Sequence, residues 1–222
     1  MDLETEQYHR REHRRSANPE YLAALLAPLR VRDQSAVLDV GCGTGYVSAY
    51  LARTHRLRRN LGLDLEAAAL DMALELNPEA GQIGWFRASA ESIPLADASV
   101  DHVICRVVLP LCDVTKAVAE ISRVMKPQGT ALLMLHSWTY YLRWISWNPS
   151  RWKRSAAGLI STGLGAWFNL TGQQLHLRVG GRSLGQTYQT QARMRAILRR
   201  HGMSAFATVA KPEFGLYARR RS

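Results

Sequence analysis

Three glycines at alternate positions, Gly41, Gly43 and Gly45, follow a short apolar segment that carries one acidic residue, Asp39. Glycine tolerates a positive φ and has no Cβ, so its main chain can approach a ligand closely. A buried carboxylate is costly unless it is paired, so we expect Asp39 to receive donors from the turn or to face a cationic ligand. The G-x-G-x-G spacing fits neither a dinucleotide fingerprint nor a triphosphate-binding loop that ends in Gly-Lys-Ser/Thr. A plain structural turn is the alternative.

A second acidic residue, Asp64, ends the apolar segment Asn60–Asp64, 19 residues after Gly45 (64 − 45). In doubly wound folds, an acid about 20 residues on binds ribose hydroxyls at the end of the second strand. Asp64 is the best candidate for that contact, and Glu66 is the next nearest. The alternative is that Asp64 only caps a helix that begins near Glu66.

The elements that must position these residues follow from the hydrophobic pattern. Asn18-Pro19 predicts a helix start, and the helix continues through Leu29. Strands alternating with helices predict a parallel sheet with helices on both faces, whose ligands lie at the carboxyl ends of the strands beside the first strand. The predicted strands are 37–40, 60–64, 83–87, 100–105 and 131–136, then an antiparallel pair at 206–209 and 214–219; further helices are predicted at 66–75, 114–125 (capped by Asp113) and 190–201.

Residues 36–136 resemble the class I S-adenosylmethionine-dependent methyltransferases in four motifs that occur in the family's order. These are the glycine turn, the acid at Asp64, the segment Trp85–Cys105, and Glu120–Gly129 before the fifth strand. Within the family, the ubiquinone/menaquinone-type small-molecule branch is the most similar. The resemblance implies an α/β fold: a doubly wound, mostly parallel seven-stranded Rossmann-like sheet, with an aromatic-rich cap insertion.

The resemblance also implies S-adenosylmethionine as cofactor, S-adenosylhomocysteine as product and no metal. The main chain around the glycine turn would approach the methionine, Asp64 would take both ribose hydroxyls, and Ser89 with Ala90 would flank the adenine. The family usually has Asp at the Ser89 position, so Glu91 is a substitute acceptor here. The implied cofactor-binding residues are Asp39, Gly41, Cys42, Gly43, Asp64, Leu65, Ser89, Ala90, Glu91 and Arg106.

The absence of two motifs narrows the class of methyl acceptor. Residues 105–112 read Cys-Arg-Val-Val-Leu-Pro-Leu-Cys, which is not the Asn/Asp-Pro-Pro-aromatic motif used on base amines, and neither cysteine has the context of a cytosine C5 nucleophile. We therefore expect in-line methyl transfer to a small, apolar or aromatic acceptor. A phenol or acidic carbon would need a general base; His136 is the first candidate and Tyr140 the second, followed by Tyr141 and His176. A structural role is the alternative for each.

Residues 137–188 are rich in Trp and Tyr, and three interpretations remain open. They form a substrate cap with apolar walls, or the core of the insertion itself, or a surface for peripheral membrane contact. We expect a single domain, divided into a helical lid (1–35), a cofactor core (36–136), the cap (137–188) and a last helix with the strand pair (189–222). Tyr8, His9 and His13 are lid candidates for the site, or part of a solvated charged helix.

Composition limits the partners. Three cysteines without a C-x-x-C pair favour a reduced compartment, and the stretch 156–170 is too short and mixed to span a bilayer. We therefore expect a cytoplasmic protein, and the alternative is a cytoplasmic protein that also contacts a membrane surface. The net charge of +11 is spread along the chain, so an RNA-binding or RNA-methylating protein is the second hypothesis, although nucleic acid is not the favoured partner. A nicotinamide dehydrogenase is the third. The oligomeric state is not indicated.

Overall fold

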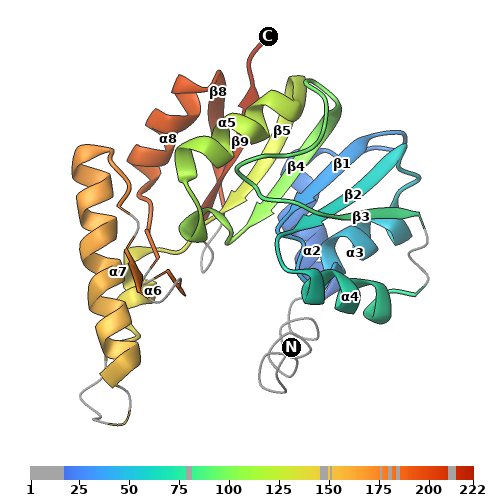
Figure 1. Cartoon of the computed structure of the whole chain (residues 1–222). Coiled ribbons are helices and arrows are strands. Elements are labelled where there is room, and N and C mark those ends of the chain that lie inside the picture. The colour runs from blue at the N-terminus through green and yellow to red at the C-terminus, as the bar shows by residue number, and fades with distance from the viewer. Residues whose placement is uncertain are drawn as a thin grey trace.

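The computed structural model describes residues 18–78, 82–145, 150, 152–175, 177–179, 182–183, 186–209 and 214–222. Their centre is one seven-stranded sheet in the order β3-β2-β1-β4-β5-β9-β8 (Figure 1). Strands β1 to β5 pair in parallel, and β9 pairs antiparallel with both β5 and β8. The predicted seven-stranded, mostly parallel sheet is therefore confirmed. Its strands are β1 (Ala36–Val40), β2 (Arg59–Asp64), β3 (Ile83–Arg87), β4 (Val100–Arg106), β5 (Met125–Met134), β8 (Met203–Thr208) and β9 (Gly215–Arg220).

Helices cover both faces of the sheet (Figure 1). On one face lie α2 (Pro19–Leu26), α3 (Tyr46–Thr54) and α4 (Ala67–Leu76); on the other lie α5 (Val114–Val124) and α8 (Gln191–Arg200). Beyond β5, the chain forms α6 (Trp138–Leu142), the long α7 (Trp152–Thr171) and a short pair, β6 (Arg178–Val179) and β7 (Arg182–Ser183). In Figure 1, α6 and α7 stand to one side of the sheet. None of the helices within the described ranges is long and apolar enough to cross a membrane.

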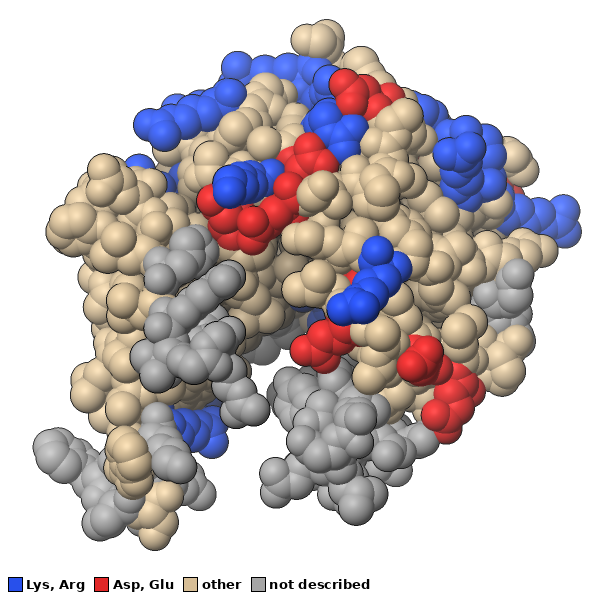
Figure 2. All heavy atoms as spheres, in the orientation of Figure 1, with Lys and Arg blue, Asp and Glu red and all other residues tan. Residues whose placement is uncertain are grey.

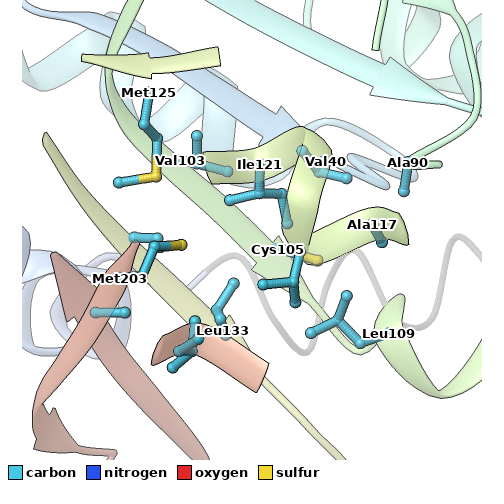
Figure 3. Close-up of a cluster of buried hydrophobic side chains, with 14 of the residues drawn as sticks. Val40, Ala90, Val103, Cys105, Leu109, Ala117, Ile121, Met125, Leu133 and Met203 are labelled. Carbon is cyan, nitrogen blue, oxygen red and sulfur yellow. The ribbon is translucent and has the colours of Figure 1, made fainter. Parts of the chain in front are cut away.

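The main core lies between the sheet and α5 (Figure 3). Successive residues of a strand face opposite sides, so Leu38 and Val40 of β1 face this core while Val37 faces α2 and α3. From α5, Ala117 and Ile121 pack on the sheet at helical spacing and are fully buried. Burying an Ile or Leu side chain contributes about 1.5–3 kcal/mol, so these contacts hold the strand ends in fixed positions.

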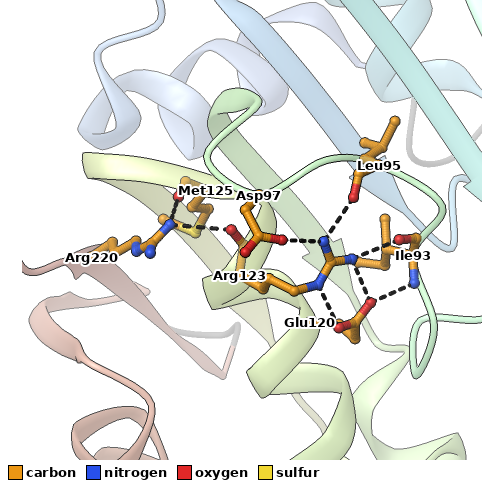
Figure 4. A network of polar contacts seen from close by, with 7 residues as sticks. All are labelled: Ile93, Leu95, Asp97, Glu120, Arg123, Met125 and Arg220. Atoms are coloured by element: carbon orange, nitrogen blue, oxygen red, sulfur yellow. Dashed lines mark hydrogen bonds and ion pairs between the residues drawn. The ribbon is translucent and has the colours of Figure 1, made fainter.

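Arg123 of α5 holds the loop between β3 and β4 (Figure 4). Its guanidinium donates to the carbonyl oxygens of Ile93 and Leu95, each at 2.7 Å, and to the carboxylates of Asp97 and Glu120. Glu120 in turn accepts from the main-chain N–H of Ile93 at 2.8 Å. The loop that follows β3 is thus bound to α5 by a planar fork of donors.

Some predicted bounds differ from the structure, and the strand predicted at 206–209 is β8 at Met203–Thr208, because Met203 already pairs with Arg220. The helix after Asn18 leaves the α conformation at Leu26 and finishes as a 3₁₀ turn, η1 (Ala27–Leu29), because Pro28 has no N–H for an α-helical bond. Strand β5 begins at Met125, because Met125 already pairs with Val100, and the residues up to Gly129 form an irregularity with Gln128 at φ +66°. It ends at Met134, so His136 lies two residues beyond the strand. Tyr8, His9, His13, Trp147 and His176 lie outside the described residues.

Candidate active site

A cavity of about 1290 Å³ lies at the carboxyl ends of the parallel strands. Figure 2 shows the molecule hollowed between the column that carries α6 and α7 and the body that carries the sheet. Every residue implied for cofactor binding lines this cavity, as do the first two candidates for the base, whereas Tyr141 is buried outside the lining. The predicted residues that line it are Asp39, Gly41, Cys42, Gly43, Asp64, Leu65, Ser89, Ala90, Glu91, Arg106, His136 and Tyr140. The structure thus brings them together around one space, and their roles remain a proposal.

The glycine turn presents bare main chain to the cavity. Gly41 has φ +69°, and a Cβ at this position would overlap the Val108 side chain. Gly43 has φ +53°, and a Cβ there would meet no atom within 4 Å. The turn is anchored from below, because the N–H groups of Gly41 and Cys42 both donate to the Leu63 carbonyl, at 2.8 and 2.9 Å. Gly41 is therefore needed for packing, whereas Gly43 leaves open space beside its main chain.

The Asp64 carboxylate joins the ends of β1 and β2. Its Oδ2 accepts from the main-chain N–H of Gly43 at 2.9 Å, and its Oδ1 accepts from that of Glu66 at 3.0 Å. The N-cap residue of α4 is Glu66, so capping of the helix by Asp64 is not the arrangement found. A carboxylate has about four acceptor sites. Two hydroxyl groups can therefore bind Asp64 without breaking either bond.

The buried Asp39 carboxyl and the partly exposed Arg106 guanidinium interact electrostatically at the same cavity. Asp39 is 3% exposed, and burial raises the pKa of its carboxyl to about 7, against the opposing effect of the Arg106 charge. The Ser48 hydroxyl donates to Asp39 at 3.3 Å. Arg106 donates to the Tyr46 hydroxyl and lies over the rings of Tyr46 and Tyr21, 5.1 and 5.9 Å from their centres. Asp39 thus accepts from Ser48 of α3 and lies near the charge of Arg106, whereas the sequence predicted donors from the glycine turn or a cationic ligand.

The wall after β3 carries Ser89 and Glu91. The Ser89 hydroxyl accepts from the main-chain N–H of Glu91 at 3.1 Å. One carboxylate oxygen of Glu91 accepts from the N–H of Asp113, the N-cap residue of α5, at 2.9 Å. Glu91 therefore fixes this loop to α5, and its carboxylate keeps acceptor sites for the substitute role that the sequence predicted.

His136 and Tyr140 form the far wall of the cavity. Their rings stack with centres 3.7 Å apart and planes 22° apart. His136 Nδ1 lies 3.4 Å from the Tyr141 hydroxyl, which donates to the Gln186 side chain at 3.0 Å. Burial lowers the pKa of His136 to about 4. His136 is therefore neutral at physiological pH and can accept a proton, but it is a weaker base than an exposed histidine.

The aromatic residues of 137–188 differ in burial, and the three predicted roles stay open. Tyr141 and Phe168 are fully buried and form the core of the insertion. Tyr140 lines the cavity. Exposed aromatic side chains form the third set: Trp138 (52%), Trp152 (63%) and Trp167 (44%).

Other residues at the cavity were not predicted from the sequence: Tyr21, Tyr46, Val108, Arg143 and Gln186. They come from elements far apart in the chain, and no local motif marks them. In the described parts of the chain, no group of three or more His, Cys, Asp or Glu side chains is placed to hold a metal ion.

Comparisons with known proteins agree with this geometry. The family described as "Methyltransferase domain" matches residues 38–133, and a second family, protein-L-isoaspartate(D-aspartate) O-methyltransferase, matches residues 8–66. A malonyl-[acyl-carrier protein] O-methyltransferase of a Methylovorus species is 36% identical over 101 residues, which cover 42% of this chain and 34% of that protein.

The uncharacterized methyltransferase YcgJ of Bacillus subtilis is 31% identical over 129 residues, covering 57% of this chain and 50% of that protein. Its crystal structure superposes with a TM-score of 0.61 over 92% of this chain and 100% of that chain, at 16% identity. A SAM-dependent methyltransferase from Aquifex aeolicus gives a TM-score of 0.57 at 18% identity, over 91% of this chain and 89% of that chain. These two superpositions show the fold.

The matched segments thus span half or less of these curated relatives' length. They contain the glycine turn, Asp64 and the strands that place both at the cavity. Motifs, sheet order and the domain matched over residues 38–133 agree, and together they support a class I S-adenosylmethionine-dependent methyltransferase.

Proposed function

We propose that this protein transfers the methyl group of S-adenosylmethionine to a small acceptor that enters the cavity beside His136 and Tyr140. One observation carries the proposal: the Asp64 carboxylate and the open main chain at Gly43 lie hydrogen-bonded to each other on a single cavity wall. A nucleoside with an amino-acid tail needs both features, a diol acceptor and a wall without side chains. The residues present therefore fit the cofactor that the family uses.

Different residues of the cavity lining would bind different parts of the cofactor. Asp64 holds the ribose diol, Ser89 with Ala90 borders the base, and the Gly41–Gly43 main chain borders the methionine. Asp39 and Arg106 set the charge of that end: ionised Asp39 favours a cation, and Arg106 favours a carboxylate. The sulfonium of the bound donor supplies an already activated methyl group, so the protein mainly has to orient the reactants. Holding them in line for attack can supply about 7–11 kcal/mol of the barrier.

The acceptor side is aromatic and weakly basic. The stacked pair of His136 and Tyr140 offers a flat wall, and Arg143 adds a cationic group to the cavity lining. A flat acceptor with an ionisable oxygen or carbon fits these groups. The relatives named as malonyl-[acyl-carrier protein] methyltransferases suggest a second class, a carboxylate on a carrier. The aromatic wall favours the first, and no observation in the structure favours the RNA hypothesis.

Calorimetric titration tests the cofactor. S-adenosylhomocysteine should bind at least about tenfold more tightly than NAD, a difference of about 1.4 kcal/mol. Tighter binding of NAD would overturn the proposal in favour of the dehydrogenase hypothesis. The acceptor is then sought with a donor that carries a labelled methyl group, offered with lipophilic phenols, a malonyl thioester of an acyl carrier, or RNA. Mass spectrometry of the products identifies which of them gains the label.

A further inference from the structure

One face of α7 packs against the rest of the insertion. Gly158 lies against the Tyr141 carbonyl and the Trp144 side chain, and Gly165 lies against the Tyr188 ring. Ser161 and Phe168 on the same face are fully buried. Because the residues of an α-helix are rotated by about 100° from one to the next, these positions form a single stripe. This stripe attaches α7 to α6 and thereby to the cavity wall.

The opposite face of α7 is also apolar, yet it is exposed. Trp152 is 63% exposed, Leu159 60%, Trp167 44% and Leu170 82%. Helical geometry places these side chains, with the exposed Gly163, in an arc of about 80° centred opposite the buried stripe. We call these residues the outer stripe of α7. A surface helix normally carries polar residues on its solvent side, so a continuous apolar stripe indicates a surface that contacts something other than water.

The insertion that carries α7 has charge of one sign. The sequence contains no Asp or Glu between Glu120 and Glu213, and residues 137–189 contain six basic residues: Arg143, Arg151, Lys153, Arg154, Arg178 and Arg182. Among the described ones, Arg143 lines the cavity, and Arg154 on the first turn of α7 lies over the Trp144 ring, on the side of the buried stripe. In Figure 2, the column that carries α7 shows no acidic side chain on this face, whereas acidic groups lie over the body of the molecule. An anionic partner is therefore complementary to the charge of the insertion as a whole.

We propose that the outer stripe of α7 docks on the surface of an anionic lipid bilayer, with the helix lying in the plane of the interface. Interfacial helices combine Trp and Leu on one face with nearby Lys and Arg, and their binding grows with buried apolar area and with attraction to anionic lipid. α7 is not apolar enough to span the bilayer, which agrees with a helix that lies on it. A second copy of this chain carries the same excess of basic residues in its insertion, which opposes pairing of two such faces.

Docking of this kind would place the cavity close to the lipid. Tyr140 of α6 lines the cavity, and α7 packs directly on α6 through Gly158. A lipophilic acceptor could then reach the site from the bilayer. This consequence rests on the proposed function, whereas the docking itself does not.

Flotation of the full chain with lipid vesicles tests the docking without any assay of activity. The vesicles are phosphatidylcholine alone, or phosphatidylcholine with about one-third phosphatidylglycerol. The variants are Leu159→Gln, the double variant Leu159→Gln/Leu170→Gln, and the control Leu74→Gln on α4. Leu159 and Leu74 are matched, at 60% and 58% exposed. Circular dichroism and S-adenosylhomocysteine binding show that each variant is folded.

The wild-type protein should float with the anionic vesicles and much less with the neutral ones. The double variant should partition at least about tenfold less into anionic vesicles, because two Leu side chains no longer enter the interface, and Leu74→Gln should stay within about twofold of wild type. Wild-type protein that fails to float, or stripe variants that float like wild type, would overturn the proposal. So would a dimer that the stripe variants convert to a monomer, because a second copy would then cover the face. Loss of flotation at high salt supports it.

Discussion

The Asp64 carboxylate accepts a 2.9 Å hydrogen bond from the main-chain N–H of Gly43. This bond joins the end of β2 to the turn after β1, the two places where the motifs of the sequence predicted contacts with the cofactor. A ligand that displaces neither group meets a preorganised wall, because carboxylate and turn already hold each other in place. The diol site and the glycine turn are therefore one unit.

Replacing Asp64 tests that unit. In Asp64→Asn, the amide NH₂ would face one of the two N–H donors, and an acceptor for a ribose hydroxyl would be lost. Hydrogen bonds to charged groups contribute about 1.5–3 kcal/mol, so the Kd for S-adenosylhomocysteine should rise by about 10- to 100-fold. Calorimetry measures it, with Asp71→Asn on the exposed side of α4 as the matched control. An unchanged Kd in Asp64→Asn would contradict the ribose role.

Two alanine substitutions in the turn should have different effects. Gly41→Ala drives a Cβ into Val108 at φ +69°, so the free energy of unfolding should fall by about 2–3 kcal/mol. Adding Val108→Ala should recover the steric part of that loss. Gly43→Ala meets open space, so its stability cost should be the smaller, about 1–2 kcal/mol for the positive φ, while S-adenosylhomocysteine binding is lost. Urea denaturation and calorimetry separate the two effects; a Gly43→Ala protein with full affinity would show that the turn does not contact the ligand.

Much of the fold could be predicted from local pattern. Strand β3 was predicted with the bounds found, because Ile83–Arg87 is an apolar run between breaks, and Asp113 was recognised as the cap of α5 by its residue type. The start of β5 was not predicted. The residues Lys126–Gly129 have the pattern of a turn, and only the pairing with β4 includes this segment in the strand.

The residues of the site also form two groups, those that a local motif marks and those that only packing brings to the cavity. Motif residues that follow strands, such as Asp64, could be found because strand ends meet at one edge of a parallel sheet. Tyr21 and Gln186 could not, because α2 and the segment after β7 reach the cavity only through packing. The same holds for the pKa of Asp39 and His136, which burial sets.

Asp39 should make stability depend on pH. Its pKa is about 7 in the folded protein against an ordinary 3.8, so between about pH 4 and 7 the folded state retains a proton that the unfolded state has lost. The free energy of unfolding should therefore fall as the pH rises through this window and level off above it. Asp39→Asn removes the buried charge, so its stability relative to wild type should increase from pH 5 to pH 8, by about 2–4 kcal/mol. Urea denaturation at both pH values checks this, and a difference that is the same at both would refute it.

His136 should not produce a kinetic ionisation near neutral pH. Because burial lowers its pKa to about 4, His136 does not change its protonation between pH 6 and 8. Its titration should therefore not change the rate of methyl transfer in this range. If His136 takes the proton, His136→Gln should lower kcat/KM by about 10²-fold with an unchanged Kd for S-adenosylhomocysteine. Tyr140→Phe keeps the stacked ring and should remain within about threefold of wild type. A rate limb near pH 6.5 that disappears in His136→Gln would show that the histidine is not desolvated during turnover.

Arg123 should stabilise the loop that follows β3 and carries Ser89. Arg123→Lys keeps the charge but cannot donate at once to Glu120, Asp97 and two carbonyls, because an ammonium lacks the planar fork. The side chain is about one-third exposed, which moderates the loss, and we expect the free energy of unfolding to fall by about 1–3 kcal/mol. Arg200→Lys, on the exposed side of α8, is the control and should change stability by less than about 0.5 kcal/mol. Because the same loop begins at Ser89, Arg123→Lys should also weaken S-adenosylhomocysteine binding. A variant with lowered stability but unchanged affinity would show that the network supports the fold without positioning the site.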